Sequence, residues 1–395
     1  MVEDIGLHYE TLPLGSDLDA ESKILSIAFG SAPEKSREWI ERSGRGLFRR
    51  VMSGAQVASV LILLPMGIYY GGRSVPMTGI AGVAVDPGFR GRGVARWMMT
   101  EALREIGRQG TALSGLYSAM HPLYRSVGFE QAGCRFRISV PLHLFPAGTR
   151  RFEELPSGSN EQVKECYQAW ASRCDGHLDR GAYVWAHIEN WRGTPMRGFV
   201  ARDAHGRVEA YVYLHQSGSA DPCQPPVVEV TDLGASTTGG LRSLMAFLGG
   251  FSSIAGKLTF FGGPSHPLLA MLDGRRYTMD LTDHWMLRVI DVRCALEQRG
   301  YARGLRGAAR FELADPVFGD QGGPWTLEVE GGGGHVSRGG SGGARVTSRA
   351  LAALYGGHLS ARQLRLMGLI EGDDAQVDAL DTVFPVGVSS MVDRF

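Results

Sequence analysis

Arginine and glycine alternate in one short segment, RGRGVAR, which covers residues 90–96. A run of small and apolar residues precedes it, and a pattern typical of an amphipathic helix follows. Small residues let a backbone approach an anion closely, and the first turn of a helix offers unpaired N–H groups at the positive end of its dipole. The pattern R-x-x-G-x-A, which Arg90, Gly93 and Ala95 form, therefore predicts a pyrophosphate site to which the arginines add charge.

Two other phosphate-binding patterns fit this turn less well. A Walker A loop requires lysine followed by serine or threonine, whereas Val94 follows Gly93. A dinucleotide-binding G-x-G-x-x-G would need a third glycine where Arg96 stands, and the preceding strands are predicted to be antiparallel. A second glycine-rich segment, residues 331–343, lacks the G-K-[ST] ending and is predicted to be a hairpin between strands.

The elements that must position this turn follow from the hydrophobic periodicity. Residues 57–85 alternate as strands do, with Gly71-Gly72 as a two-residue hairpin turn, which predicts an antiparallel meander. Apolar residues then recur at three and four positions over 93–109, which predicts a helix that Gly110 ends. The segment 111–119 predicts the next strand, and HPLYRSVGF after it predicts a short helix.

A similar order of elements follows a first boundary near residue 145. Residues 146–290 again predict helix, hairpin, strand, helix and strand, but Ala235-Ser236-Thr237-Thr238 stand where the first unit has its arginine-glycine turn. This order predicts a duplication in which only the unit 1–145 keeps the ligand chemistry. Residues 291–395 form a third predicted unit, with a helix, strands, the glycine-rich hairpin and a C-terminal helical stretch.

Composition sets limits on partners and on location. A chain of 395 residues exceeds the size of one hydrophobic core, so two or three domains are expected. Its 41 basic residues balance 41 acidic ones, which predicts no binding of nucleic acid or of an anionic membrane. Five scattered cysteines form no C-x-x-C pair, and the acidic N-terminal segment resembles no signal peptide, so we expect a cytoplasmic protein. The longest apolar run is too short to cross a bilayer.

The motif, the duplication and the third unit together resemble a known superfamily. R-x-x-G-x-A after GVAVDPGF resembles the acetyl-CoA signature of the GCN5-related N-acetyltransferases (GNAT), and the whole chain resembles the Eis (enhanced intracellular survival) type. The resemblance implies an α/β (α+β) architecture. Two GNAT folds, each a mixed and largely antiparallel sheet with flanking helices, would precede a domain similar to sterol carrier proteins. It also implies a homohexamer that passes acetyl from acetyl-CoA to an amine, such as an aminoglycoside or a lysine-like group.

The resemblance assigns binding roles to particular residues. Val83, Ala84 and Val85 would present main-chain groups to the pantetheine arm and the thioester of acetyl-CoA. Ala119 and Met120 would flank the cofactor from the following strand. The pyrophosphate would be held by Arg90, Gly91, Arg92, Gly93, Val94, Ala95 and Arg96.

Acetyl transfer to an amine moves two protons, so an acid and a base are expected. The resemblance places the general acid at Tyr124, which would donate to the departing thiolate of coenzyme A. From the residues alone, Tyr124 packing on its own helix and His121 acting as the acid remain alternatives. The base implied by the resemblance is the α-carboxylate of the last residue, Phe395, on an apolar tail that returns to the active site. The alternative is a final strand of the third unit, with its carboxylate in water.

The acceptor side of the site is less defined by the sequence. Phe29 and Trp39 are candidates for the wall of the acceptor pocket, with core packing as the alternative. Arg394, beside the terminal carboxylate, would oppose a polycationic substrate, and Asp393 is a candidate to offset it by contacting the amine. The histidines show no H-E-x-x-H pattern and no Cys/His spacing, so no metal is predicted. Two other functions stay open: acetylation of protein lysines, or a non-catalytic sensor that binds coenzyme A and a lipid.

Overall fold

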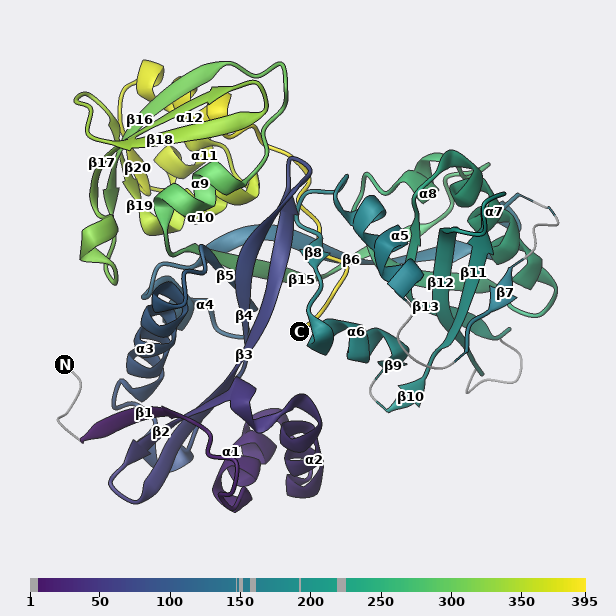
Figure 1. Cartoon of the computed structure of the whole chain (residues 1–395), viewed down its shortest axis with the longest axis horizontal. Helices are drawn as coiled ribbons and strands as arrows, with labels where there is room; N and C mark the ends of the chain where they lie inside the picture. The colour runs from purple at the N-terminus through teal and green to yellow at the C-terminus, as the bar shows by residue number, and fades with distance from the viewer. Residues whose placement is uncertain (1–5, 147, 149–151, 157–160, 192, 219–224) are drawn as a thin grey trace.

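The computed structural model of the chain describes residues 6–395 except 147, 149–151, 157–160, 192 and 219–224. Figure 1 shows three lobes, coloured purple to blue, teal, and green to yellow along the chain. The predicted α+β architecture is confirmed, since a mixed and mostly antiparallel sheet carries helices on its flanks. Among the helices of the described residues, none combines the length and the apolar character that a bilayer crossing requires.

The first lobe is built from a long β-hairpin and the elements around it. The Gly71-Gly72 turn and the helix predicted after the arginine-glycine segment are confirmed, since β3 and β4 pair up to Tyr70 and Arg73 and a helix begins at Val94. Its elements in chain order are β1 (Leu7–Thr11), α1 (Asp19–Phe29), α2 (Pro33–Ser43), β2 (Phe48–Ser53), β3 (Gln56–Tyr70), β4 (Arg73–Val85), α3 (Val94–Arg108), β5 (Leu113–Tyr117), α4 (His121–Arg125) and β6 (Glu130–Pro141).

The second lobe repeats much of this order. Its elements are β7 (Glu153–Glu154), α5 (Glu161–Ala171), β8 (Leu178–Asp179), α6 (Ala182–Glu189), β9 (Asn190–Trp191), β10 (Thr194–Pro195), β11 (Arg197–Arg202), β12 (Val208–Ser217), β13 (Val227–Ala235), α7 (Thr238–Gly249), β14 (Lys257–Gly262), α8 (Pro267–Ala270) and β15 (Thr278–Val289). The strand-to-helix step from β13 to α7 corresponds in order to the step from β4 to α3.

The two lobes exchange their last strands and so share one sheet. Thirteen strands of the described residues form it, with the central order β3-β4-β5-β15-β6-β14-β13-β12. β15, the last strand of the second lobe, lies between β5 and β6 of the first, and β6 in turn pairs with β14 of the second. The sheet order is therefore mirrored about the β15–β6 pair. The predicted boundary at residue 145 stays a prediction, because the strands on its two sides are interleaved.

The third lobe has a sheet of its own and packs on the shared sheet through α10. Its elements are α9 (Val292–Gln298), β16 (Gly307–Ala314), β17 (Gly323–Glu330), β18 (Gly333–Arg338), β19 (Ala344–Thr347), α10 (Ser348–Gly356), α11 (Ala361–Leu366), β20 (Ile370–Glu371) and α12 (Asp374–Val383), with sheet order β18-β17-β16-β19-β20. The hairpin predicted in the glycine-rich segment is confirmed at Gly331-Gly332, between β17 and β18. The helical stretch predicted after it is two helices, because Gly357 takes a left-handed conformation (φ 66°) that ends α10.

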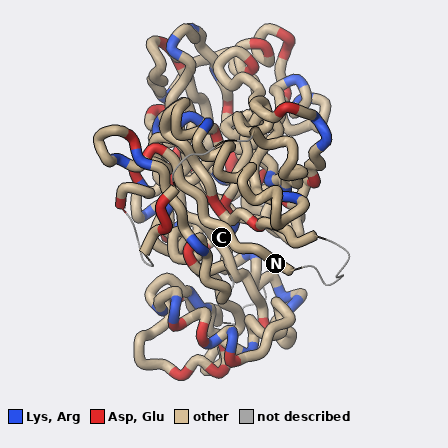
Figure 2. The backbone as a smooth tube through the Cα atoms, turned by 90° about the vertical axis from the view of Figure 1, so that its right-hand side faces the viewer, with Lys and Arg blue, Asp and Glu red and all other residues tan. Residues whose placement is uncertain are grey.

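The final residues leave the third lobe and run along β6 toward the centre of the molecule (Figure 1). The amide of Cys134 donates to the carbonyl of Ser389 at 3.2 Å, and the amide of Met391 donates to the carbonyl of Cys134 at 3.2 Å. We call residues 385–395 the tail. Figure 2 shows basic and acidic residues interspersed over the molecule, as the balanced composition predicts.

Candidate active site

The strands β4 and β5 pair in parallel and then separate, which opens a fork in the shared sheet. Their ladder ends at Gly79 and Gly115. Beyond that point β5 pairs with β15, while β4 continues alone to Val85, paired only with β3 among the described residues. A β-bulge also shifts the β3–β4 register, since Val60 faces Ala84 but Ile62 faces Ala81. The predicted segment 83–85 thus has an unpaired main-chain edge that faces the fork, which a ligand amide can join as an added strand.

Helix α3 begins directly beyond this edge without a side-chain cap. Its N-cap is Gly93, in the left-handed conformation at φ 81°, and no side chain accepts from the first-turn N–H groups. Arg90, Arg92 and Arg96 are exposed around it, and none of the three forms an ion pair within the described part of the chain. Uncapped N–H groups, the positive dipole end and guanidinium groups without a carboxylate partner are features that favour an anion, as the sequence predicts for this turn. Val94 is buried under this turn and Ala95 is half-buried.

The corresponding junction in the second lobe is closed by its own side chains. Thr237 caps α7 by accepting from the amide of Gly240 at 2.8 Å. The Thr237 hydroxyl also donates to the Glu209 carboxylate at 2.6 Å, which puts an anion beside this helix start. The second lobe therefore has the helix but neither the open N–H groups nor the positive charge. The prediction that only the first unit keeps the ligand chemistry stays a prediction, and the capped start of α7 is consistent with it.

Tyr124 lies at the mouth of the fork on the β5 side. It packs in the cluster that contains Ile80 of β4, Leu116 of β5 and Val94 of α3, and its ring meets Phe129 edge to face at 6.2 Å. The side chain is 8% exposed, and its hydroxyl has no hydrogen-bond partner among the described residues. Burial raises the pKa of Tyr124 to about 12, so the phenol stays protonated at neutral pH.

The other predicted residues of this edge are more open. Ala119 and Met120 are exposed between β5 and α4, with Met120 at 61%. His121 begins α4, and its Nε2 lies 3.1 Å from the side-chain amide of Gln131. This contact joins the imidazole to a side chain of β6.

The end of the tail lies at the point where β4 and β5 separate. The ring of Phe395 packs edge to face on Tyr117 at 5.7 Å, and a Cβ on Gly79 would stand 2.7 Å from that ring. Gly79 and Tyr117 flank the fork from its two strands. The last residue of the chain, about 300 positions after the arginine-glycine turn, therefore lies at the fork that also leads to this turn.

A buried ion cluster fixes the tail just before its end. The guanidinium of Arg180, with a fully buried side chain, contacts the Asp393 carboxylate at 2.8 Å and that of Asp232 at 2.6 Å. Tyr117 donates to the main-chain carbonyl of Asp393 at 2.6 Å, and Arg135 donates to that of Val392 at 3.0 Å. The carboxylate of Asp393, predicted to contact the amine, is instead committed to Arg180. Sequence reasoning did not find Arg180, because its two partners lie 52 and 213 residues away.

The two aromatic candidates of the first helices differ in placement. Trp39, on α2, packs edge to face on Phe48 at 5.1 Å and donates from Nε1 to the Tyr183 hydroxyl of α6 at 3.0 Å. A Cβ on Gly82 would stand 2.7 Å from its ring, so Trp39 also lies against the bulged part of β4. Phe29 is 57% exposed at the end of α1.

Cavities extend from α2 along α6 to the tail. One of about 410 Å³ is lined by Arg42 of α2 and by Tyr183 and His187 of α6. His187 also lines a narrow gap of about 20 Å³ beside Asp393 and Arg394. Burial lowers the pKa of His187, so its ring is neutral at neutral pH.

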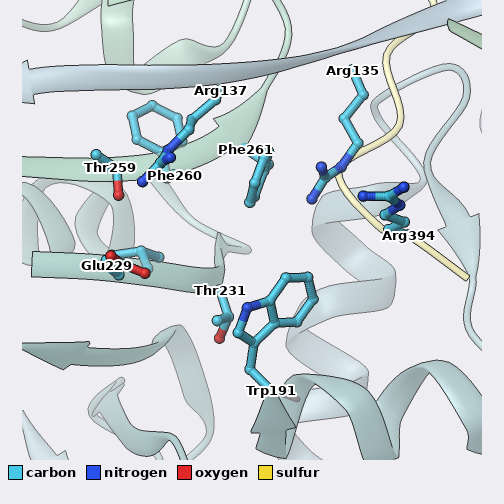
Figure 3. Close-up of a pocket in the computed structure, with 10 residues that line it drawn as sticks. Arg135, Arg137, Trp191, Glu229, Thr231, Thr259, Phe260, Phe261 and Arg394 are labelled. Atoms are coloured by element: carbon cyan, nitrogen blue, oxygen red, sulfur yellow. The ribbon is translucent and has the colours of Figure 1, made fainter. Parts of the chain in front are cut away.

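A third cavity, of about 210 Å³, continues from that gap at the second fork, where β13 and β14 part after Glu229 and Thr259. Figure 3 shows the guanidinium groups of Arg135 and Arg394 at one end, Arg137 and Glu229 at the other, and Phe261 and Trp191 between them.

Cations predominate among the charged side chains that line these cavities. Arg42, Arg137 and Arg394 form no ion pair within the described residues, and the guanidinium of Arg135 stacks 3.3 Å from the centre of the Phe261 ring. Among the described residues that line these cavities, the carboxylates are Asp393 and Glu229, and Glu229 accepts from the Ser217 hydroxyl at 3.1 Å. Of these arginines, the sequence analysis named only Arg394. The others lie on β6 and α2, which are distant from the tail in the sequence and come near it only in the folded chain.

Known families match all three parts of the chain. Residues 15–132 and residues 176–289 each match an acetyltransferase (GNAT) domain, and residues 292–392 match a sterol carrier protein domain. The N-acetyltransferase Eis of Mycobacterium tuberculosis is 25% identical over 319 residues, which cover 76% of this chain and 73% of that protein. The chain therefore contains two GNAT acetyltransferase domains and is similar to the Eis N-acetyltransferases. The predicted family and the predicted series of two GNAT folds and a sterol-carrier-like domain are both confirmed.

Solved structures share the arrangement of this Eis-like acetyltransferase. A GCN5-related N-acetyltransferase from Anabaena variabilis superposes with a TM-score of 0.92 at 27% identity, over 98% of this chain and 100% of that one. Eis1 from Mycobacterium abscessus shares the fold, with a TM-score of 0.80 at 18% identity over 98% and 100% of the two chains. Proteins that share only 18–27% of their residues with this chain therefore have the same overall fold over nearly its whole length.

Proposed function

We propose that this Eis-like protein transfers an acetyl group from acetyl-CoA directly to a small-molecule amine in a ternary complex. The observation that carries the proposal is the fork between β4 and β5. One of its edges is unpaired, an uncapped helix N-terminus lies beyond that edge, and the tail ends at its base. No other junction in the described chain combines these three features.

The donor would bind along the edge of β4 and over the start of α3. Main-chain groups of residues 83–85 would pair with the amides of the pantetheine arm, which places the thioester near the base of the fork. The amides that follow Gly93 and the guanidinium groups of Arg90, Arg92 and Arg96 would hold the pyrophosphate. The absence of a carboxylate or hydroxyl cap at Gly93 supports this role, because such a cap would occupy the same N–H groups.

Tyr124 would act as the general acid. When the amine attacks the thioester carbon, the carbon–sulfur bond breaks and negative charge develops on the sulfur. The raised pKa keeps Tyr124 protonated, so its hydroxyl can donate to that sulfur throughout the working pH range. The lack of a protein partner for this hydroxyl supports the role, since nothing in the described chain competes for its proton.

The α-carboxylate of Phe395 would act as the base. An alkylammonium has a pKa near 10.4, so it must lose a proton before it attacks. Packing of the Phe395 ring on Gly79 and Tyr117 puts the end of the tail beside the expected thioester. The ion cluster at Asp393 supports this assignment in another way: it holds the chain two residues before Phe395, and so restricts where the terminal carboxylate can lie.

The acceptor would enter through the cavities along α6 and the tail. These cavities are lined by arginines, and the carboxylates that face them already have partners. A polycation would meet unfavourable charge there, whereas an amine that also carries a carboxylate or phosphate could place that anion on a guanidinium. We therefore expect anionic or zwitterionic amines to be better acceptors than aminoglycosides.

The test is release of free coenzyme A thiol from acetyl-CoA in the presence of an amine panel. The panel contains amino acids, aminoalkyl phosphates, aminoglycosides and a lysine peptide. Turnover with any small amine supports an acetyltransferase. Turnover restricted to the peptide would indicate a protein acetyltransferase, and tight acetyl-CoA binding without turnover of any amine would contradict the proposal and favour a sensor.

A further inference from the structure

A cluster of three metal-ligating side chains lies outside the fork, where the first and third lobes meet. Cys134 of β6 and His284 of β15 face each other across the strand pair, and His358 lies between α10 and α11. The Cys134 Sγ atom is 3.4 Å from His284 Nδ1, and the rings of His284 and His358 are 5.7 Å apart at 67°. One ligand atom from each residue lies within 4.8 Å of the other two.

The geometry points to a zinc-binding site: we propose that Cys134, His284 and His358 coordinate one Zn²⁺ ion, with water in the fourth position. Zn²⁺ prefers thiolate and imidazole ligands at about 2.3 Å and about 2.0–2.1 Å in a tetrahedron. Two ligands of such an ion are about 3.3–3.6 Å apart, and the Cys134–His284 pair already has this separation. The remaining approach of His358 requires only rotation of side chains, since all three residues are partly exposed.

The surroundings fit a site that is prepared for a cation. The cluster offers one sulfur and two imidazole groups, which are ligand types that Zn²⁺ prefers, and all three side chains are partly open to solvent, from which an ion would enter. No arginine or lysine of the described chain forms an ion pair or hydrogen bond with any of the three side chains.

An ion at this position would connect the exchanged strands to the tail. The main chain of Cys134 hydrogen-bonds to the tail on both of its sides, at Ser389 and at Met391. The zinc would therefore link β6, β15 and the third lobe at the point where the tail begins its path toward the fork. Sequence spacing could not predict this site, because its ligands are separated by 150 and 74 residues, taken as 284 − 134 and 358 − 284.

The experiment uses the full chain, purified without chelators and then loaded with Zn²⁺ or Co²⁺. We expect one Zn²⁺ per chain by elemental analysis, and for Co²⁺ a near-ultraviolet thiolate charge-transfer band with strong tetrahedral d–d bands. Cys134→Ser should remove the charge-transfer band, and His358→Gln should weaken Zn²⁺ binding at least about 100-fold, since changes outside the ligands already cost 10–100-fold. Cys294→Ser and His335→Gln are matched controls remote from the cluster.

The outcomes separate clearly. Loss of binding in both cluster variants, with retention in both controls and unchanged circular dichroism, supports the site. A wild-type chain that binds no Zn²⁺ at micromolar concentrations, or a Co²⁺ spectrum that survives Cys134→Ser, would overturn it. Because metal content is measured directly, this result does not depend on whether the protein acetylates an amine.

Discussion

Replacement of Tyr124 by phenylalanine should remove catalysis without removing stability. The Tyr124 hydroxyl has no hydrogen-bond partner among the described residues, so its loss leaves no buried group unpaired and should change the free energy of unfolding by less than about 0.5 kcal/mol. Loss of a proton donor typically lowers a rate by about 10²-fold or more, which corresponds to about 2.7 kcal/mol in the barrier. The chemical step should therefore slow about 100-fold.

Tyr9→Phe provides the opposite pattern. The Tyr9 hydroxyl, on β1, donates at 2.7 Å to the carboxylate of Glu105 in the last turn of α3, at the opposite end of this helix from the arginine-glycine turn. A hydrogen bond to a charged group contributes about 1.5–3 kcal/mol, so Tyr9→Phe should lower Tm while leaving the rate unchanged. Tyr124→Phe should do the reverse.

The assay is single-turnover thiol release at saturating acetyl-CoA, combined with Tm and with the dissociation constant for acetyl-CoA. The rate loss should be equal at about pH 7 and about pH 9, because the raised pKa keeps Tyr124 protonated at both. A Tyr124→Phe rate within about threefold of wild type would remove this residue from the mechanism. A rate loss accompanied by a fall in Tm as large as that of Tyr9→Phe would instead assign it to packing.

Three other changes test separate parts of the site, and a pH dependence tests the stability of the fold. One glycine appended to Phe395 moves the terminal carboxylate by about 3.3–3.6 Å, beyond hydrogen-bond reach, so kcat should fall about 100-fold with acetyl-CoA affinity unchanged; an active extended chain would exclude the carboxylate. Gly93→Asp places an anion and a cap at α3, and acetyl-CoA binding measured by calorimetry should weaken at least about tenfold. Arg394→Glu should raise kcat/KM for an aminoglycoside relative to an amino acid at least about tenfold, and an unchanged ratio would contradict an acceptor path beside the tail. Burial lowers the pKa of two histidines, His177 directly before β8 and His266 at the start of α8, to about 3. The stability that each neutral ring contributes is fully present above about pH 6.5 and is lost by about 1.4 kcal/mol per pH unit as the pH falls toward 3. Urea unfolding at several pH values should show this loss, and a flat profile would contradict it.

The sequence determined the local structure of the donor side. Alternation and helical periodicity are short-range patterns, so they predicted the β3–β4 hairpin, the helix α3 and the uncapped Gly93 at its start. The same reasoning distinguished the second lobe, where Thr237 stands at the corresponding junction and caps α7. These features depend on neighbours within a few residues, which the sequence contains directly.

Only the tertiary structure decided the features that are built from segments far apart in the sequence. The exchange of β6 and β15 is a pairing choice between strands of similar pattern, and alternation alone does not select a partner strand. Because of that exchange, Arg135 comes beside the tail, Arg180 holds Asp393, and Cys134 faces His284. The sequence therefore predicts by itself where an anionic cofactor would bind, whereas the proposed acceptor cavities and the proposed metal site exist only once the two lobes share one sheet.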